Sequence, residues 1–241
     1  MFAYGKVDRG IYTIYFPDVA QFEFRPDRPL VGVLATPATT DAALEDLFLT
    51  TVRPLFLQVA GYEALHASAI QTTRGVVAFC GASGSGKSTL AFALVRRAFE
   101  PWADDVLVFD AEREADVVSV HVPHPPRLRG PTRQFFLVED GTSPVAHAGL
   151  QRPAPLALVF VLRQDDVHAV RRLSPPEALE RLLPHGLRFT LSDAERRRRM
   201  MAHYLNLVGT VKVFELGFRR GLDRLPMLLD EIEQVIGNEP D

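Results

Sequence analysis

The stretch GASGSGKST, residues 81–89, lies between the apolar run VVAFC and the helix-like run LAFALV. Its glycines cost conformational entropy on folding and have no side chains to pack in a core. Gly81, Gly86, Lys87 and Ser88 fill every fixed position of the phosphate-binding pattern G-x-x-x-x-G-K-[ST]. A strand that ends in such a loop, followed by a helix, presents backbone N–H groups and the positive helix end to an anion. The stretch therefore predicts a loop that encloses a nucleotide phosphate.

The side chains of this loop have separate expected tasks. Lys87 would reach the β- and γ-phosphates, and the Ser88 hydroxyl would bind Mg²⁺. The predicted nucleotide-binding residues are Gly81, Ala82, Ser83, Gly84, Ser85, Gly86, Lys87, Ser88 and Thr89. A phosphate-binding loop alone does not distinguish a transferase from an ATPase or GTPase that moves a switch.

Two adjacent carboxylates follow the loop. The segment between them and the loop is about long enough for one helix and a return to the sheet. Asp104 and Asp105 stand directly before the apolar run VLVF. One could hold Mg²⁺ while the other accepts the proton of an acceptor hydroxyl; an exposed acidic turn is the alternative. His66, in LHAS ahead of the loop, is a third candidate, although a strand histidine by itself is more often a hydrogen-bonded structural residue.

Composition narrows the class of protein. The 241 residues, 47% of them hydrophobic, suffice for one large domain or a domain with a small annex. The longest apolar runs fall well short of the roughly 18 residues of a membrane span, and the first twenty residues lack a secretory signal pattern. Cys80 is the only cysteine and is expected to be a small core residue. We expect a cytoplasmic protein, and a net charge of -3 gives no general attraction to nucleic acid.

The first third of the chain has the pattern of a small, mostly antiparallel sheet followed by a helix. The expected strands are IYTIYF (11–16), QFEFR (21–25) and LVGVL (30–34). From Asp41 to Phe56 apolar residues recur at spacings of three and four, which predicts a helix, with a kink at Pro54.

The remainder alternates strand-like and helix-like segments. LHASAI and VVAFC are expected to form a hairpin, and LAFALVRRAF (90–99) a helix; further strands are expected at VLVF (106–109), VVSVHV (117–122), LALVFVLR (156–163) and VKVFEL (211–216). The proline-rich segment PHPPRLRGPTRQFF is expected to be a loop. Ser192 and Glu195 form a capping box ahead of an exposed basic helix. The last helix is expected in DRLPMLLDEIEQVIG, with Asp223 as its cap.

The set formed by His66, GASGSGKS and Asp104–Asp105 resembles the catalytic domain of HPr kinase/phosphorylase. That family has a histidine ahead of a loop G-x-S-G-x-G-K-S and an Ala-Asp-Asp triplet after the following helix. The resemblance covers about residues 60–130 with specific motifs and the C-terminal part more loosely. It implies an α/β fold related to phosphoenolpyruvate carboxykinase rather than the parallel sheet of most P-loop NTPases.

The resemblance also implies roles for individual residues. Lys87 and Ser88 would bind phosphate and Mg²⁺, Asp105 would be the catalytic base, Asp104 would support the metal, and His66 would lie beside the transferred phosphoryl group. Residues 61–241 would form the nucleotide-binding catalytic domain. Residues 1–60 would form a β-rich annex packed on it, too short for the separate N-terminal domain usual in the family.

Two departures from the family pattern bear on the reaction. Thr89 and Arg127 stand where the family has glutamates, and Arg127 precedes Arg129 and Gly130 in the segment RLRG. The absence of these two carboxylates disfavours the phosphorylase activity. Arg127 or Arg129 could instead contact the γ-phosphate or an acidic group on the acceptor, so both are candidate catalytic residues.

Four segments, LHASAI, GASGSGKSTLA, WADD and VFELGFRRGLDRLP, resemble HPr-kinase-related kinases of peptide natural-product pathways. These include kinases that phosphorylate the C-terminal serine of lasso-peptide precursors. The sequence therefore predicts an ATP- and Mg²⁺-dependent kinase of a serine-type hydroxyl on a peptide or protein. HPr itself is not the expected substrate. A small-molecule hydroxyl kinase and a weakly hydrolysing nucleotide-binding regulatory module are the alternatives. Neither nucleic acid nor membrane is an expected partner, and the resemblance allows a ring-like homo-oligomer.

Overall fold

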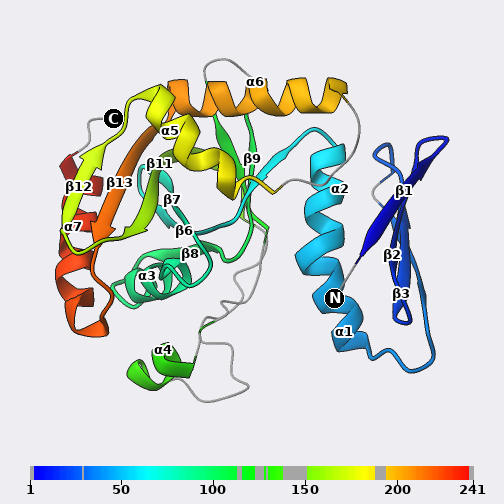
Figure 1. The fold of residues 1–241 in the computed structure, drawn as a ribbon, viewed down its shortest axis with the longest axis horizontal. Helices are drawn as coiled ribbons and strands as arrows, with labels where there is room; N and C mark the ends of the chain where they lie inside the picture. Colours follow the sequence, from blue (N-terminus) through cyan, green and yellow to red (C-terminus); the bar gives the residue numbers. More distant parts are fainter. Residues whose placement is uncertain are drawn as a thin grey trace. The chain divides into compact units, whose positions relative to one another are not determined.

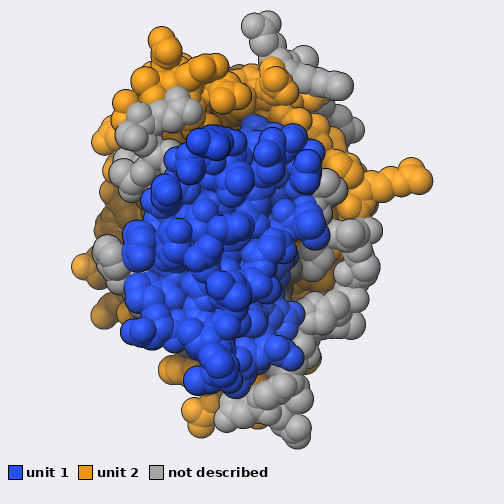
Figure 2. All heavy atoms as spheres, turned by 90° about the vertical axis from the view of Figure 1, so that its right-hand side faces the viewer, with its two compact units in different colours: residues 1–62 blue, residues 63–241 orange. Residues whose placement is uncertain are grey.

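The computed structural model divides into two compact units, residues 1–62 and residues 63–241 (Figure 2). The residues that it describes are 3–28, 30–112, 116–122, 128, 130–137, 151–187 and 194–238.

The first unit contains a four-stranded antiparallel sheet in the order β1-β2-β3-β4. Its strands are β1 (Tyr4–Asp8), β2 (Ile11–Phe16), β3 (Ala20–Phe24) and β4 (Val31–Ala35). Ile14 and Phe16 in β2, and Phe22 and Phe24 in β3, are buried, as expected for strands with one face on a core. The predicted antiparallel sheet is present, and β1 is an additional strand that the sequence reasoning missed.

The helical segment of the first unit is interrupted just before Pro54. It consists of α1 (Asp41–Leu47), the π-helical turn η1 (Phe48–Val52) and α2 (Arg53–Val59). The N–H of Arg53 donates to the carbonyl of Phe48, five residues back. A proline inside a helix lacks an N–H and clashes with the preceding turn, so the disturbance expected at Pro54 takes the form of a π turn.

Residues 63–241 are built on a mixed sheet. Hydrogen-bonded neighbours follow the order β5-β9-β10-β11-β7-β6-β8, and β13 pairs with β11 and β12. β7, β11 and β13 run parallel, and the other pairs are antiparallel. The α/β class is thus confirmed. The strands are β5 (Glu63–Leu65), β6 (Ala67–Thr72), β7 (Gly75–Gly81), β8 (Glu100–Ala103), β9 (Leu107–Asp110), β10 (Val118–Val120), β11 (Ala154–Gln164), β12 (Ala169–Arg172) and β13 (Lys212–Phe218).

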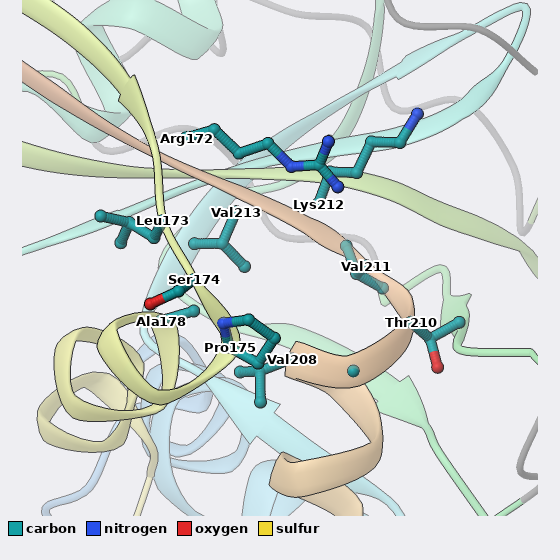
Figure 3. A pocket seen from close by; sticks show the side chains of 11 residues that line it. Arg172, Leu173, Ser174, Pro175, Ala178, Val208, Thr210, Val211, Lys212 and Val213 are labelled. Atoms are coloured by element: carbon teal, nitrogen blue, oxygen red, sulfur yellow. The ribbon is translucent and has the colours of Figure 1, made fainter.

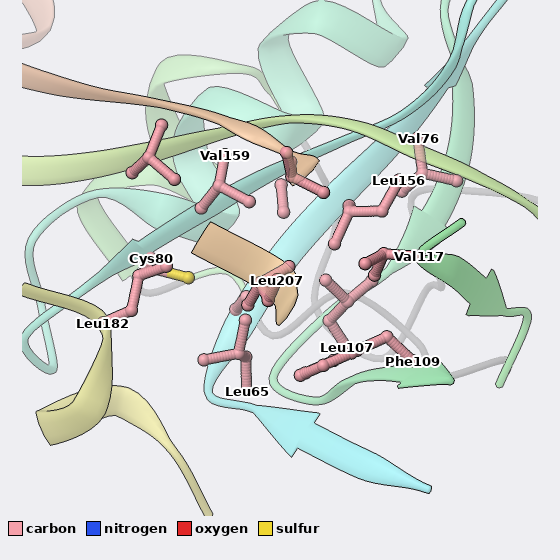
Figure 4. Packing of buried hydrophobic residues seen from close by; sticks show 14 of the residues in the cluster. Leu65, Val76, Cys80, Leu107, Phe109, Val117, Leu156, Val159, Leu182 and Leu207 are labelled. Atoms are coloured by element: carbon pink, nitrogen blue, oxygen red, sulfur yellow. The ribbon is translucent and has the colours of Figure 1, made fainter. Parts of the chain in front are cut away.

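Each face of this sheet carries its own apolar cluster, because successive side chains of a strand point to opposite faces. In β7, Val77 and Phe79 join the cluster that includes α3 and α7, whereas Val76, Ala78 and Cys80 join the cluster that includes α5 and α6 (Figure 1, Figure 4). All five side chains are fully buried. β7 is therefore a fully buried strand between β11 and β6, and the following loop emerges from its end. The helices are α3 (Lys87–Val95), α5 (Pro175–Leu182), α6 (Ala194–Thr210) and α7 (Leu225–Asn238).

Several local expectations need correction. Residues 130–135 of the proline-rich segment form the helix α4 (Gly130–Phe135) rather than a loop, which is compatible with Pro131 because proline is tolerated in the first turn. Asp223 lies inside a 3₁₀ turn, η3 (Leu222–Arg224), and does not cap α7. The strands β8 and β12 were not foreseen, and the predicted cap at Ser192 lies outside the described residues. None of the helices in the described ranges is long and apolar enough to span a bilayer.

Candidate functional site

The candidate residues gather at one edge of the mixed sheet. Gly81 ends β7 and pairs with Leu162 near the end of β11, and Gln164 at the end of β11 pairs with Phe218 at the end of β13. The antiparallel strand β6 begins at the same edge, where Ala67 pairs with Cys80. Ligands of open α/β sheets bind beyond the carboxyl ends of the parallel strands, so this edge is the natural place for a site.

Two glycine positions shape the loop after β7. Gly86 precedes α3 with a φ of +107°, a left-handed conformation that disfavours other residues. A Cβ at Gly81 would lie 2.7 Å from Ser85 Oγ and 3.0 Å from the carbonyl oxygen of Leu162. Both positions therefore require glycine. The strand, the loop and the helix follow one another as the sequence predicts.

The ammonium of Lys87 folds back onto this loop. It donates hydrogen bonds to the carbonyl oxygens of Gly81, at 2.9 Å, and Ala82, at 3.2 Å, and the side chain is buried. Ser85 Oγ is also buried, and within the described residues it has no hydrogen-bond partner. Buried polar groups normally find partners, and an anion at the N-terminal end of α3 would supply one. These residues fit a phosphate group.

Asp104 is buried between β8 and β9 and belongs to a second polar group beside the loop. Its Oδ1 accepts a 2.5 Å hydrogen bond from Ser68 Oγ in β6. Ser68 Oγ lies 3.4 Å from Ser88 Oγ in the first turn of α3. The structure thus brings together the two predicted Mg²⁺ ligands, Ser88 and Asp104, through a residue that the sequence reasoning did not single out.

The hydroxyl oxygen of Ser88 and the carboxylate oxygens of Asp104 suit a cation that also binds a nucleotide. The described ranges contain no cluster of three or more His, Cys, Asp or Glu residues that could hold a metal by themselves. Mg²⁺ in phosphoryl-transfer sites usually takes one or two protein oxygens and completes its shell with phosphate and water. Ser88 and Asp104 fit that donor set.

Asp105 has different surroundings from its neighbour. Its backbone is left-handed, with a φ of +70°, and its Oδ1 and carbonyl oxygen lie 3.1 Å and 2.9 Å from Nδ1 of His66. Both oxygens are acceptors, so Nδ1 of His66 carries the hydrogen. The Asp105 and His66 side chains are each 33% exposed, whereas Asp104 is buried. Asp105 can therefore meet an incoming molecule, and its carboxylate is oriented by His66.

His185 joins the site through the backbone. It ends the 3₁₀ turn η2 (Leu183–His185), and its carbonyl oxygen accepts a 2.7 Å hydrogen bond from the His66 N–H. Burial lowers the pKa of its imidazole, and the positive charges of Lys87 and His66 lower that pKa further. No local sequence pattern marks His185.

Gln164 and Arg220 support the loop from the other side. Arg220 Nη2 donates a 2.6 Å hydrogen bond to the Gly84 carbonyl oxygen. The Gln164 side-chain oxygen, oriented toward Arg220, accepts from its Nε at 2.7 Å and its Nη2 at 3.2 Å. Gln164 ends β11 and Arg220 lies two residues beyond β13, both far from the loop in sequence, and neither was predicted as a site residue.

The remaining candidates lie near or beyond the described part of the chain. Thr89 Oγ1 is 3.1 Å from Thr132 Oγ1 in α4, so its side chain has a partner outside the loop. Arg127 and Arg129 lie outside the described residues, and their catalytic roles stay predictions from the sequence.

A pocket of about 370 Å³ lies at the start of β13. Its lining includes Arg172, Ser174, Thr210 and Lys212 (Figure 3). The loop residue Gly84 is held by Arg220, beyond the opposite end of β13. The pocket is therefore separate from the site around Lys87.

No family model matches the sequence, and no curated protein matches it. Among solved structures, the chain is similar to the Hpr(Ser) kinase/phosphatase from Coxiella burnetii, with 13% sequence identity and a TM-score of 0.37 over 73% of this chain and 99% of that chain.

Proposed function

We propose that this protein is an ATP- and Mg²⁺-dependent phosphotransferase that phosphorylates a serine-type hydroxyl of a peptide or protein. One observation carries the proposal. The glycine loop with its buried Lys87 is flanked by two different carboxylates, Asp104 linked through Ser68 to Ser88, and Asp105 held by His66. Phosphate binding, metal binding and a base are the parts that phosphoryl transfer needs.

The loop and the metal ligands hold the donor. Lys87 and the backbone N–H groups at the start of α3 bind the phosphates of ATP. Ser88 and Asp104 bind Mg²⁺, which when bound neutralises the charge that develops on the phosphate oxygens. Burial of Lys87 and Asp104 makes their interactions with the donor stronger than they would be in water.

Asp105 acts on the acceptor. As the acceptor oxygen bonds to the γ-phosphorus and the bond to the ADP oxygen breaks, Asp105 takes the hydroxyl proton. His66 donates through Nδ1 to Asp105 and so fixes the direction of the carboxylate. We assign Asp105 as the base and Asp104 to the metal because Asp105 is the more exposed of the two.

The reaction is proposed to run in one direction. Thr89 is neutral and bonded to Thr132, and the sequence places Arg127 where the resembling family has a carboxylate. Metal affinity then rests mainly on Ser88, Asp104 and the nucleotide. Incubation of the phosphorylated product with inorganic phosphate and Mg²⁺ tests this point. Release of pyrophosphate would refute it.

The acceptor is proposed from the resemblance of LHASAI, WADD and VFELGFRRGLDRLP to kinases of peptide natural-product pathways. A ribosomal peptide precursor with a C-terminal serine, such as a lasso-peptide precursor, is the acceptor class that this resemblance supports. The phosphate-binding loop, the metal ligands and the base would serve a small-molecule hydroxyl equally well.

Incubation with γ-labelled ATP, Mg²⁺ and a panel of serine-ended peptides and small alcohols, followed by mass spectrometry, tests the function. We expect label on a peptide hydroxyl with wild-type protein and with Asp110→Asn, a matched charge loss at the other end of β9, and little with Asp105→Asn. Label on small alcohols alone would replace the peptide acceptor. ATP binding without transfer to any of them would favour the regulatory module.

A further inference from the structure

Ser68 lies in the segment LHASAI but is not one of the predicted site residues, and it stands between the two proposed Mg²⁺ ligands, Asp104 and Ser88. It is fully buried in β6. Its hydroxyl oxygen lies 2.5 Å from Asp104 Oδ1 and 3.4 Å from Ser88 Oγ. The three side chains come from β6, α3 and the junction of β8 with β9, so they meet only in the folded chain.

The chemistry of the three groups fixes the direction of both hydrogen bonds. A carboxylate has no hydrogen to give, so the Ser68 hydroxyl donates to Asp104. That hydroxyl has a single hydrogen, and therefore it can only accept on the side of Ser88. Ser88 consequently donates to Ser68, and the hydrogen of Ser88 points toward Ser68 while its lone pairs are directed elsewhere.

We propose that Ser68 is a positioning residue that orders the two Mg²⁺ ligands as one unit; the proposal rests on the proposed function. A serine can ligate a cation only through a lone pair, and Ser68 removes the alternative in which the Ser88 hydrogen faces the metal. Ser68 also fixes the plane of the Asp104 carboxylate. Both ligands are thereby oriented before the metal arrives, which lowers the ordering cost of binding.

A purely structural role for Ser68 would leave metal binding unchanged. In that case its hydroxyl would serve only to satisfy the buried Asp104. Ser119 provides the matched control, because it is also fully buried in the same sheet, accepts a 2.7 Å hydrogen bond from Trp102 and donates a 3.1 Å bond to the Val108 carbonyl. Loss of the Ser119 hydroxyl should lower the melting temperature without changing metal affinity.

The test is Mn²⁺ binding in the presence of ATP, followed by electron paramagnetic resonance, together with metal-free ATP binding and thermal melting. The main comparison is Ser68→Thr against Ser68→Val, since the two side chains have nearly the same shape and only threonine keeps the hydroxyl. Ser68→Ala is a second variant that adds no volume to the buried position.

We expect Ser68→Val and Ser68→Ala to bind Mn²⁺ roughly ten- to a hundredfold more weakly than wild type, as for loss of a hydrogen bond to a charged group. Ser68→Thr should recover much of that affinity, and metal-free ATP binding should change little. Ser119→Ala should bind Mn²⁺ like wild type.

Equal Mn²⁺ affinity in wild type and in Ser68→Ala or Ser68→Val would overturn the role of Ser68 while leaving the proposed function standing. A wild-type protein that binds no ATP with Mn²⁺ would overturn both. The two failures are therefore distinguishable.

Discussion

Asp104 and Asp105 are neighbours in the sequence but face different partners, and this difference gives a prediction. Asp104 accepts from Ser68, and Asp105 pairs with His66. Asp105→Asn should keep Mg²⁺·ATP binding and lose about 10²- to 10⁴-fold in kcat, the usual contribution of a positioned base. Asp104→Asn should instead raise the Mg²⁺ concentration needed for half-maximal rate. Steady-state kinetics at varied Mg²⁺ measure both effects, and the opposite pattern would exchange the two roles.

The sequence predicted these two carboxylates as site residues but could not show which way each side chain faces. The two side chains face different partners because the backbone of Asp105 is left-handed and because Ser68 and His66, which contact them, come from another part of the chain. Ser68 lies in the quoted segment LHASAI, but no role could be predicted for it, because the role of a serine in a strand depends on its buried neighbours.

The loop 82–86 is held by Gln164 at the end of β11 and by Arg220, two residues beyond the end of β13. Arg220 donates to the Gly84 carbonyl, and Gln164 accepts from Arg220. Arg220→Ala should weaken ATP binding about two- to tenfold, the range for one typical hydrogen bond, with little change in melting temperature because Arg220 is exposed.

Arg219→Ala is the control for that substitution, since Arg219 is the adjacent exposed arginine. Fluorescence titration with a labelled nucleotide compares the three proteins. Identical affinities for wild type, Arg220→Ala and Arg219→Ala would show that the Gly84 contact does not support the loop.

Local elements were easier to predict from the sequence than those set by distant pairing. The unit from β7 through the loop to α3 follows from a contiguous motif and an apolar strand. α4 was missed because prolines around it indicated a loop. His185 was missed because it reaches the site through an antiparallel bridge between Leu65 and Gly186, a pairing that no local pattern encodes.

At the scale of the whole molecule, His185 should make stability depend on pH. Burial, followed by the charges of Lys87 and His66, lowers its pKa in the folded state. Below the ordinary histidine pKa of about 6.5 the unfolded chain then binds a proton that the folded chain does not, so stability falls as the pH drops through this range. Burial also lowers the pKa of His121, so this residue adds to the same loss of stability at low pH.

His185→Gln should reduce this dependence. Urea unfolding at about pH 7.5 and about pH 5.5 should give a smaller difference in the free energy of unfolding for the variant than for wild type. His121 still contributes in the variant, so part of the dependence should remain. An unchanged difference would mean that the His185 proton is not linked to folding.

Cys80 should report the opening of the whole second unit. It is the only cysteine in the chain, it is fully buried in the cluster of Figure 4, and burial raises the pKa of its thiol to about 12. A thiol-specific reagent should label it slowly in the native protein and rapidly in denaturant. Mg²⁺·ATP should slow native labelling further by stabilising the folded state; rapid labelling of the native protein would contradict its burial.

The nucleotide site at residues 81–89 is tested by calorimetric titration of Mg²⁺·ATP into wild type, Lys87→Met and Lys6→Met. Lys87 is buried on the loop, whereas the Lys6 side chain is 64% exposed in β1, so the pair separates loss of the site cation from loss of any lysine charge. We expect one site in wild type and in Lys6→Met, and affinity at least roughly tenfold weaker in Lys87→Met, as for loss of a charge-assisted contact. No binding by wild type, or equal affinity in all three proteins, would contradict it.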